Sequence, residues 1–149
     1  ISMFLAELLS YATRHEQANG ALYLFIQDSI EWLDHAKGAI ANFHIVFMIQ
    51  LSFHLGFMPN IESGMSGDYF DLVDGCFAAH VPSHVHYLNK EDSMRLVSLF
   101  RLDYKTMHLY TMSRIERNRC VEVILEYYKL HLPDFPEMKS FSVLQELFA

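Results

Sequence analysis

The chain has 149 residues, of which 52% are hydrophobic, 14% aromatic and 19% charged, and its formal net charge is −7. This length and composition predict one globular domain with enough apolar residues for a core, and they exclude a disordered chain, a coiled coil and a collagen. The two cysteines, Cys76 and Cys120, match no disulfide framework of a secreted protein. We therefore expect a cytoplasmic protein.

The first part of the chain is predicted to be helical. The spacing of apolar residues predicts helices over residues 3–14 and 21–36, each with one buried face. The segment 39–55 is apolar all round, which is typical of a central core helix, and its five polar residues argue against a membrane span. Gly56 is expected to end this helix in a left-handed cap, with Pro59 after it.

Residues 57–88 interrupt the helical pattern. The stretch from Asp68 to Phe77 predicts two short strands around an Asp74-Gly75 turn, which would make a small irregular β-hairpin insertion. The predicted fold class is therefore mainly α: a helical bundle around a central apolar helix, with this insertion.

Three more helices are predicted after the insertion. Asn89 is expected to cap the first, with Asp92 near its positive end. A capping box of Ser113 and Glu116 opens the longest one, at about 114–131. A last short helix follows two prolines, and its apolar residues are Val143, Leu144, Leu147 and Phe148.

Charge is distributed unevenly along the chain. Residues 1–89 carry 2 basic and 9 acidic side chains, whereas residues 90–149 carry 9 of each. Within the second part, the segment 95–119 has six cations and two carboxylates. Since local fields decide which partners a surface attracts, this segment predicts a site for an anionic partner on an acidic protein.

Arg117 has two open interpretations. It falls on the side of the long helix that should face the core, where a guanidinium needs a partner. One interpretation is an internal ion pair with Asp103 or Glu116. The other is an anion site at the helix start, where free backbone amides favour negative groups. The cations proposed for this site and its surroundings are Arg101, Lys105, Arg114, Arg117 and Arg119.

The opposite face of the long helix is predicted to be solvated. Its polar residues are Asn118, Arg119, Glu122, Glu126 and Lys129. We expect two ion pairs at i,i+3 spacing on this face, Arg119 with Glu122 and Glu126 with Lys129.

The nine histidines give no strong metal-binding pattern. One local set of cysteine and histidine residues has a spacing that zinc tolerates, but it lacks the close ligand pairs of structural zinc sites. We therefore expect no metal and no cofactor. The members of this set are Cys76, His80, His84 and His86. His44 and His54 lie too far apart on the central helix to chelate one ion, and we expect both to be buried and hydrogen-bonded.

Catalytic motifs are also absent. The sequence has no nucleophile elbow, no glycine-rich phosphate loop and no H-E-x-x-H helix. The early carboxylates show no signature of a tuned pair and are expected on exposed faces; they are Glu7, Asp28, Glu31 and Asp34. We therefore expect no enzymatic activity.

The chain resembles one known family over essentially its whole length. The segments that carry the resemblance are ANFHIVFMIQLSFHLGFMPN (41–60), YFDLVDGCF (69–77) and YKTMHLYTMSRIERNRCVEVILEYYKLHLPDFPEMKSFSVLQELF (104–148). They resemble the RecO recombination mediators of the Bacteroides type. The resemblance implies a RecO-like C-terminal helical domain over residues 1–149, with the insertion at 57–88, and an N-terminal oligonucleotide-binding barrel that this sequence does not include.

The resemblance also implies a function. RecO proteins act in DNA repair and recombination: they help RecR to load RecA on single-stranded DNA, and they contact DNA and the acidic, phenylalanine-ended tail of single-stranded DNA-binding protein. Such a tail requires cations and an apolar pocket. We expect this site near Arg101 and Lys105, with a pocket formed by Leu99, Leu102 and Tyr104. DNA binding by this chain alone is expected to be weak and salt-dependent.

Two points stay open at the level of sequence. Many relatives hold zinc with four cysteines in the stretch that corresponds to 60–86, but this chain keeps only Cys76 there, with no thiol from Gly64 to Gly67. We expect the insertion to have lost its metal. The alternative function is a helical sensor domain for a small ligand, which a cavity beside His44 and Met48 would favour.

Overall fold

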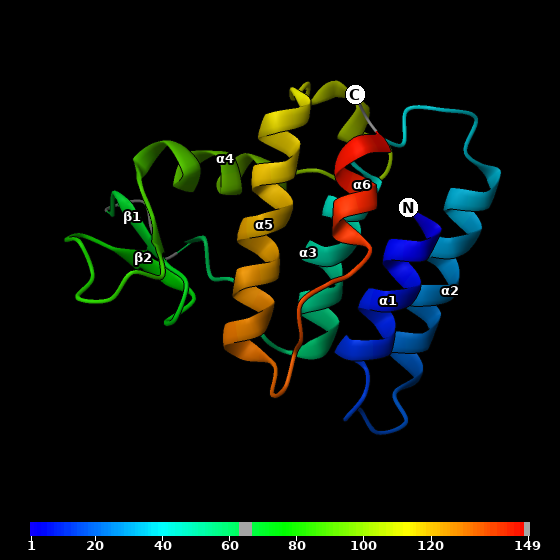
Figure 1. Cartoon of the computed structure of the whole chain (residues 1–149), viewed down its shortest axis with the longest axis horizontal. Coiled ribbons are helices and arrows are strands. Elements are labelled where there is room, and N and C mark those ends of the chain that lie inside the picture. The colour runs from blue at the N-terminus through cyan, green and yellow to red at the C-terminus, as the bar shows by residue number, and fades with distance from the viewer. Residues whose placement is uncertain (63–66, 148–149) are drawn as a thin grey trace.

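The computed structural model describes residues 1–62 and 67–147, so the predictions at Gly64 and Phe148 lie outside the described residues. Six α-helices and three short strands form the described part (Figure 1). In chain order these elements are α1 (Ser2–Ala12), α2 (Gly20–His35), α3 (Phe43–Leu55), β1 (Tyr69–Asp71), β2 (Cys76–Ala78), β3 (Tyr87–Leu88), α4 (Lys90–Phe100), a 3-10 turn η2 (Met107–Leu109), α5 (Arg114–His131) and α6 (Phe141–Leu147). The mainly helical class with a small β insertion is confirmed.

Helix α3 is the centre of the bundle. It packs against α2, α4 and α5, and nine of its residues are buried (Figure 1). Neighbours on several sides explain why its sequence is apolar all round. The helix begins at Phe43 rather than at residue 39, because Gly38 and Ala39 adopt left-handed backbone angles (φ 133° and 57°) that an α-helix does not accommodate. Its predicted end at Gly56 is confirmed, with φ 90°.

The insertion is a sheet with strand order β2-β1-β3, in which both pairings are antiparallel. The predicted hairpin is confirmed, and Gly75 in its turn has φ 68°. The third strand was not predicted, since two residues are too few to show an alternating pattern. Ser93 of α4 joins two strands, because its hydroxyl accepts from the Phe70 amide (3.0 Å) and donates to the Leu88 carbonyl (3.2 Å).

Helix α5 fastens the insertion to the bundle. Glu126 Oε1 lies 2.8 Å from Nδ1 of His86, the Tyr127 hydroxyl donates to the Phe57 carbonyl (2.5 Å), and His131 Nε2 lies 2.8 Å from the Leu72 carbonyl oxygen. The predicted pair of Glu126 with Lys129 is therefore wrong: the insertion covers Glu126, and Lys129 pairs with Glu137 instead.

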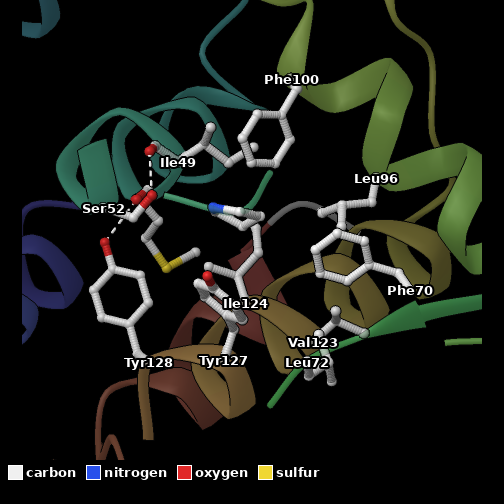
Figure 2. A pocket seen from close by; sticks show the side chains of 12 residues that line it. Ile49, Ser52, Phe70, Leu72, Leu96, Phe100, Val123, Ile124, Tyr127 and Tyr128 are labelled. Carbon is white, nitrogen blue, oxygen red and sulfur yellow. Dashed lines mark hydrogen bonds between the residues drawn. The ribbon is translucent and has the colours of Figure 1, made fainter. Parts of the chain in front are cut away.

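An apolar seam joins α3, α4, α5 and β1. Side chains from all four elements point toward one another in Figure 2, among them Ile49, Leu96, Val123 and Phe70. The space left between them is about 10 Å³, which is enough for no more than a water molecule. The fully buried Tyr128 reaches across the seam and donates to the Met48 carbonyl at 2.6 Å. The bundle and the insertion thus share one packed interior.

Helix α1 holds the C-terminal segment through Glu7. Its carboxylate accepts hydrogen bonds from the Ser140 amide (2.8 Å), the Ser140 hydroxyl (2.7 Å) and the Lys139 amide (3.0 Å). Partial burial opposes ionisation of Glu7, but these bonds and one from Tyr11 outweigh it, so the pKa of Glu7 is lowered. The prediction of a plain exposed carboxylate is wrong at this position.

Candidate functional site

The start of α5 is fixed by its predicted capping box. Ser113 Oγ accepts from the Glu116 amide (3.1 Å), and the Glu116 carboxylate accepts from the Ser113 amide (2.9 Å). The first turn of α5 is open to solvent: Arg114 is exposed, and Ile115 is 80% exposed. The cap therefore presents a cation and an apolar side chain together at the surface.

The next cation along α5, Arg117, is hydrogen-bonded to buried residues of the protein. Its Nε donates to Asn42 Oδ1 (3.2 Å) and a terminal nitrogen donates to the Met112 carbonyl (3.2 Å). Partial burial lowers the pKa of Arg117. The sequence predicted that the Arg117 side chain points toward the core, and this is confirmed. The two carboxylates considered as its partners, Asp103 and Glu116, bind other groups. Glu116 caps α5 and pairs with Arg95 (3.6 Å), and Asp103 accepts from the turn that follows it.

Asn42 connects three segments at this point. It is 4% exposed, and its amide nitrogen donates to the carbonyls of Met107 (3.0 Å) and Tyr110 (2.9 Å) while its oxygen accepts from Arg117. Between Asn42, Arg117 and residues 107–112 lies a hollow of about 180 Å³. The hollow places a guanidinium beside polar and apolar walls at the molecular surface, an arrangement that the sequence did not reveal.

The remaining predicted cations divide into two groups. Arg101, Lys105 and Arg114 are exposed and take part in no ion pair within residues 1–62 and 67–147. Arg119 lies 3.4 Å from Asp92 on α4 and 3.8 Å from Glu122, so the predicted ion pair of Arg119 with Glu122 is confirmed. Three cations between residues 101 and 114 are thus available to an anionic partner, whereas the charge of Arg119 is balanced by carboxylates.

The turn that carries Lys105 is built by Asp103. Its carboxylate accepts from the amide and hydroxyl of Thr106 (2.8 and 3.0 Å) and from the Lys105 amide (2.9 Å). These hydrogen bonds lower the pKa of Asp103, and the bonds from Thr106 have the largest effect. The turn is therefore fixed by its own side chains while Lys105 extends into solvent.

The three residues of the predicted apolar pocket all pack in or against the same core cluster. Leu99 is 2% exposed within the core, and Leu102 is half-buried against that core. The Tyr104 ring packs against Phe43 and Trp32 (centroids 4.8 and 5.2 Å), and its hydroxyl donates to Ser29 at 2.7 Å. Burial raises the pKa of Tyr104 to about 12. The large apolar residues that are exposed within residues 101–117 are instead Leu109 (72%) and Ile115 (80%).

Two of the three histidines of the insertion, His84 and His86, contact carboxylates. His84 Nε2 lies 3.0 Å from Asp71, and His86 contacts Glu126 as described above, while Cys76 is a half-buried free thiol in β2. In the described residues, no group of three or more histidine, cysteine or carboxylate side chains is placed to hold a metal ion. A structural zinc site needs four such ligands, so the side chains described here do not fit zinc.

The buried side of the central helix leaves almost no space beside Met48. Met48 is fully buried, and the space beside it is the seam of about 10 Å³. His44 is 1% exposed, as predicted, and burial lowers the pKa of His44 to about 3, so its ring is neutral. His54 is only half-buried and stacks on Phe25 (4.5 Å), so the prediction of a buried His54 is wrong. These observations do not support the sensor alternative.

Comparisons with known proteins agree on one family. The family model described as "Recombination protein O C terminal" matches residues 1–140. Relatives named DNA repair protein RecO from Phocaeicola vulgatus and Bacteroides fragilis are each 48% identical over 149 residues, which cover 100% and 99% of this chain and 62% of each relative. A third, from Azobacteroides pseudotrichonymphae, is 38% identical over 148 residues, covering 99% of this chain and 61% of the relative.

The chain spans about three fifths of the length of these curated relatives. No solved structure matches it significantly. No helix in the described part is long and apolar enough to cross a membrane. The family match covers nearly the whole chain and the relatives share almost half of its residues, so this chain belongs to the family of RecO C-terminal domains.

Proposed function

We propose that this chain is the helical domain of a DNA repair and recombination mediator, which helps RecR to load RecA on single-stranded DNA and contacts DNA and single-stranded DNA-binding protein. Membership of the RecO family supports a role in DNA repair. The role is one of binding rather than catalysis, and it belongs in the cytoplasm, at the nucleoid. The chain works without zinc, and elemental analysis of the purified protein tests this: stoichiometric zinc would contradict it.

One observation carries the proposed contact with the acidic tail of single-stranded DNA-binding protein. Arg101, Lys105 and Arg114 are exposed and form no salt bridge in the described part of the chain. Hydrogen bonds between such cations and carboxylates are among the stronger polar contacts. The carboxylates of the tail would bind these side chains.

The aromatic ring at the end of the tail needs apolar surface close to these cations. Because Leu99 is buried in the core, we place the ring at the hollow of about 180 Å³ beside Arg117, whose lining includes Met107, Tyr110 and Met112. Leu102 and Tyr104 remain behind this surface as the support of the turn that carries Lys105.

Calorimetric titration with a peptide of the acidic tail tests the proposal. The double variant Arg101→Glu/Lys105→Glu and the single variant Arg114→Glu should each bind the peptide at least about tenfold more weakly, because attraction is replaced by repulsion at a solvent-exposed site. Lys139→Glu is the matched control, since Lys139 is an exposed cation near α1. Unchanged affinity in the first two variants, or an equal loss in the control, would remove the assignment.

Binding of single-stranded DNA is expected at the same cations and is tested separately. Residues 1–89 carry 9 acidic and 2 basic side chains, which repel phosphates and restrict DNA to the α5 side. Fluorescence anisotropy with a labelled oligonucleotide should show weak binding that falls steeply with salt. Affinity that does not change between low and high salt would contradict this mode of binding.

A further inference from the structure

A second surface lies between α2 and α3, which run side by side (Figure 1). It is an open groove of about 490 Å³. The side chains that define it are Leu24, Phe25, Asp28, Trp32, His54 and Tyr104. None of the cations proposed to bind the acidic tail lines this groove.

The floor of the groove is aromatic and held in place. Phe25 stacks on Phe47 (centroids 5.2 Å apart) and on His54 (4.5 Å), and Trp32 stacks on Phe43 (5.8 Å). Rigid, half-buried aromatic side chains are typical of the residues that dominate binding at protein interfaces. Apolar surface continues beyond the floor, since Leu24 is 58% exposed, and Tyr23 and Phe53 are 60% and 64% exposed.

The rim of the groove is acidic. Asp28 lines it, and Glu31 and Asp34 are exposed further along the same helix. These three carboxylates take part in no ion pair with any described residue. Lys105 follows Tyr104 in the chain and is the nearest cation in sequence to the groove residues. The balance of charge disfavours an acidic peptide or a nucleic acid here and favours a cationic partner.

We propose that this groove docks an amphipathic helix of a partner protein, with large apolar residues facing the groove and lysine or arginine residues facing α2. The lining residues of α2 run from Ala21 to Trp32, a length of about 16 Å at 1.5 Å per residue, which matches about three turns of a bound helix. Apolar residues at i, i+3, i+4 and i+7 of the partner would contact Leu24, Phe25 and Trp32. This inference requires the opposite charge to the proposed acidic-tail site, and it shares with that site only Tyr104, which lines the groove and supports the turn that carries Lys105.

The protein carries its own reporter for the test, since Trp32 is its single tryptophan. The probe is a synthetic helical peptide of leucine and lysine with an apolar stripe three turns long. Titration should shift Trp32 emission to shorter wavelength in a saturable way, because the ring loses contact with water. The control peptide replaces every lysine by glutamate. It should produce no shift at the same concentrations.

Variants then distinguish docking in the groove from non-specific attraction. Asp28→Lys should weaken binding of the lysine peptide about tenfold, as should Leu24→Gln, and both positions are exposed enough for the fold to tolerate the change. Glu146→Lys, at an exposed position of α6, is the matched control and should bind as the unchanged protein does. Circular dichroism confirms that each variant is folded.

The proposal fails if the glutamate peptide binds equally well, if Asp28→Lys and Leu24→Gln bind as tightly as the control, or if Trp32 emission does not respond. It also fails if a form of the protein extended to the length of its relatives no longer binds the peptide, because the groove would then be covered by its own chain. Each of these results leaves the Arg101, Lys105 and Arg114 measurements unaffected, so the two proposals succeed or fail separately.

Discussion

Replacing Asn42 by alanine should remove three hydrogen bonds that meet at the start of α5. Two are neutral bonds to the carbonyls of Met107 and Tyr110, each contributing about 1 kcal/mol, and the third joins Asn42 to the charged Arg117 and contributes about 1.5 kcal/mol. Because the side chain is 4% exposed, water replaces these bonds poorly. We expect the free energy of unfolding to fall by about 3.5 kcal/mol, which is a decrease in Tm of about 7–14 °C for a chain of this length.

Urea unfolding followed by circular dichroism measures this change, with the slope against urea checked for constancy. Asn118→Ala is the control, because Asn118 is half-buried on α5 but makes no side-chain hydrogen bond to a described residue. Asn42→Asp adds a second comparison, since it keeps an acceptor for Arg117 and loses both donors. A loss below about 0.5 kcal/mol in Asn42→Ala would refute the assignment of Asn42 as the connecting residue.

Three further changes probe other contacts. Glu7→Gln should lower the free energy of unfolding by about 2 kcal/mol at neutral pH. The pKa of Glu7 in the folded protein is below its ordinary value of 4.5. The difference in unfolding free energy between Glu7→Gln and wild type should therefore shrink as the pH falls below 4.5 and through the lowered pKa of the folded state. An equal difference in urea unfolding at low pH would be inconsistent with this. Gly75→Ala should destabilise the insertion by about 1–2 kcal/mol, since φ is 68° and an added Cβ would lie 2.9 Å from the Tyr127 hydroxyl. Adding Tyr127→Phe to the same chain should recover part of this loss in a double-mutant cycle. Ser113→Ala should cost about 1 kcal/mol by removing the α5 cap, whereas the exposed Ser10→Ala should change stability little in the same thermal melts.

Sequence reasoning succeeded where the signal is local. The left-handed cap at Gly56, the Asn89 cap and the Ser113 capping box each depend on residues within a few positions, and all three are confirmed. The class of the fold followed from the same kind of signal, because apolar spacing predicts which faces are buried.

Predictions failed where distant segments decide the outcome. Glu7 binds Ser140, which is 133 residues away, and Glu126 binds His86, which is 40 residues away. Neither partner can be chosen from the spacing within one helix. The start of α3 depends in the same way on tertiary contacts, because Asn42 is held by carbonyls of the 107–110 turn.

The candidate site was predicted in its charges but not in its shape. Six cations between residues 95 and 119 are visible in the sequence, and the exposure of Arg101, Lys105 and Arg114 agrees with that pattern. Whether a cation is neutralised depends on α4, which supplies Asp92 to Arg119. The hollow beside Arg117 and the groove along α2 arise only when separate segments pack together, so neither has a signature in the sequence.

The position of α3 has a consequence for biosynthesis. Its apolar surface is completed by α5, which begins at Arg114, far later in the chain than Leu55. A nascent chain that has emerged only as far as the insertion therefore presents an uncovered apolar helix to solvent, the kind of surface that chaperones bind and that aggregates when left alone. Truncations that stop before His131 should accumulate as insoluble protein, even though they contain the whole of α1, α2 and α3.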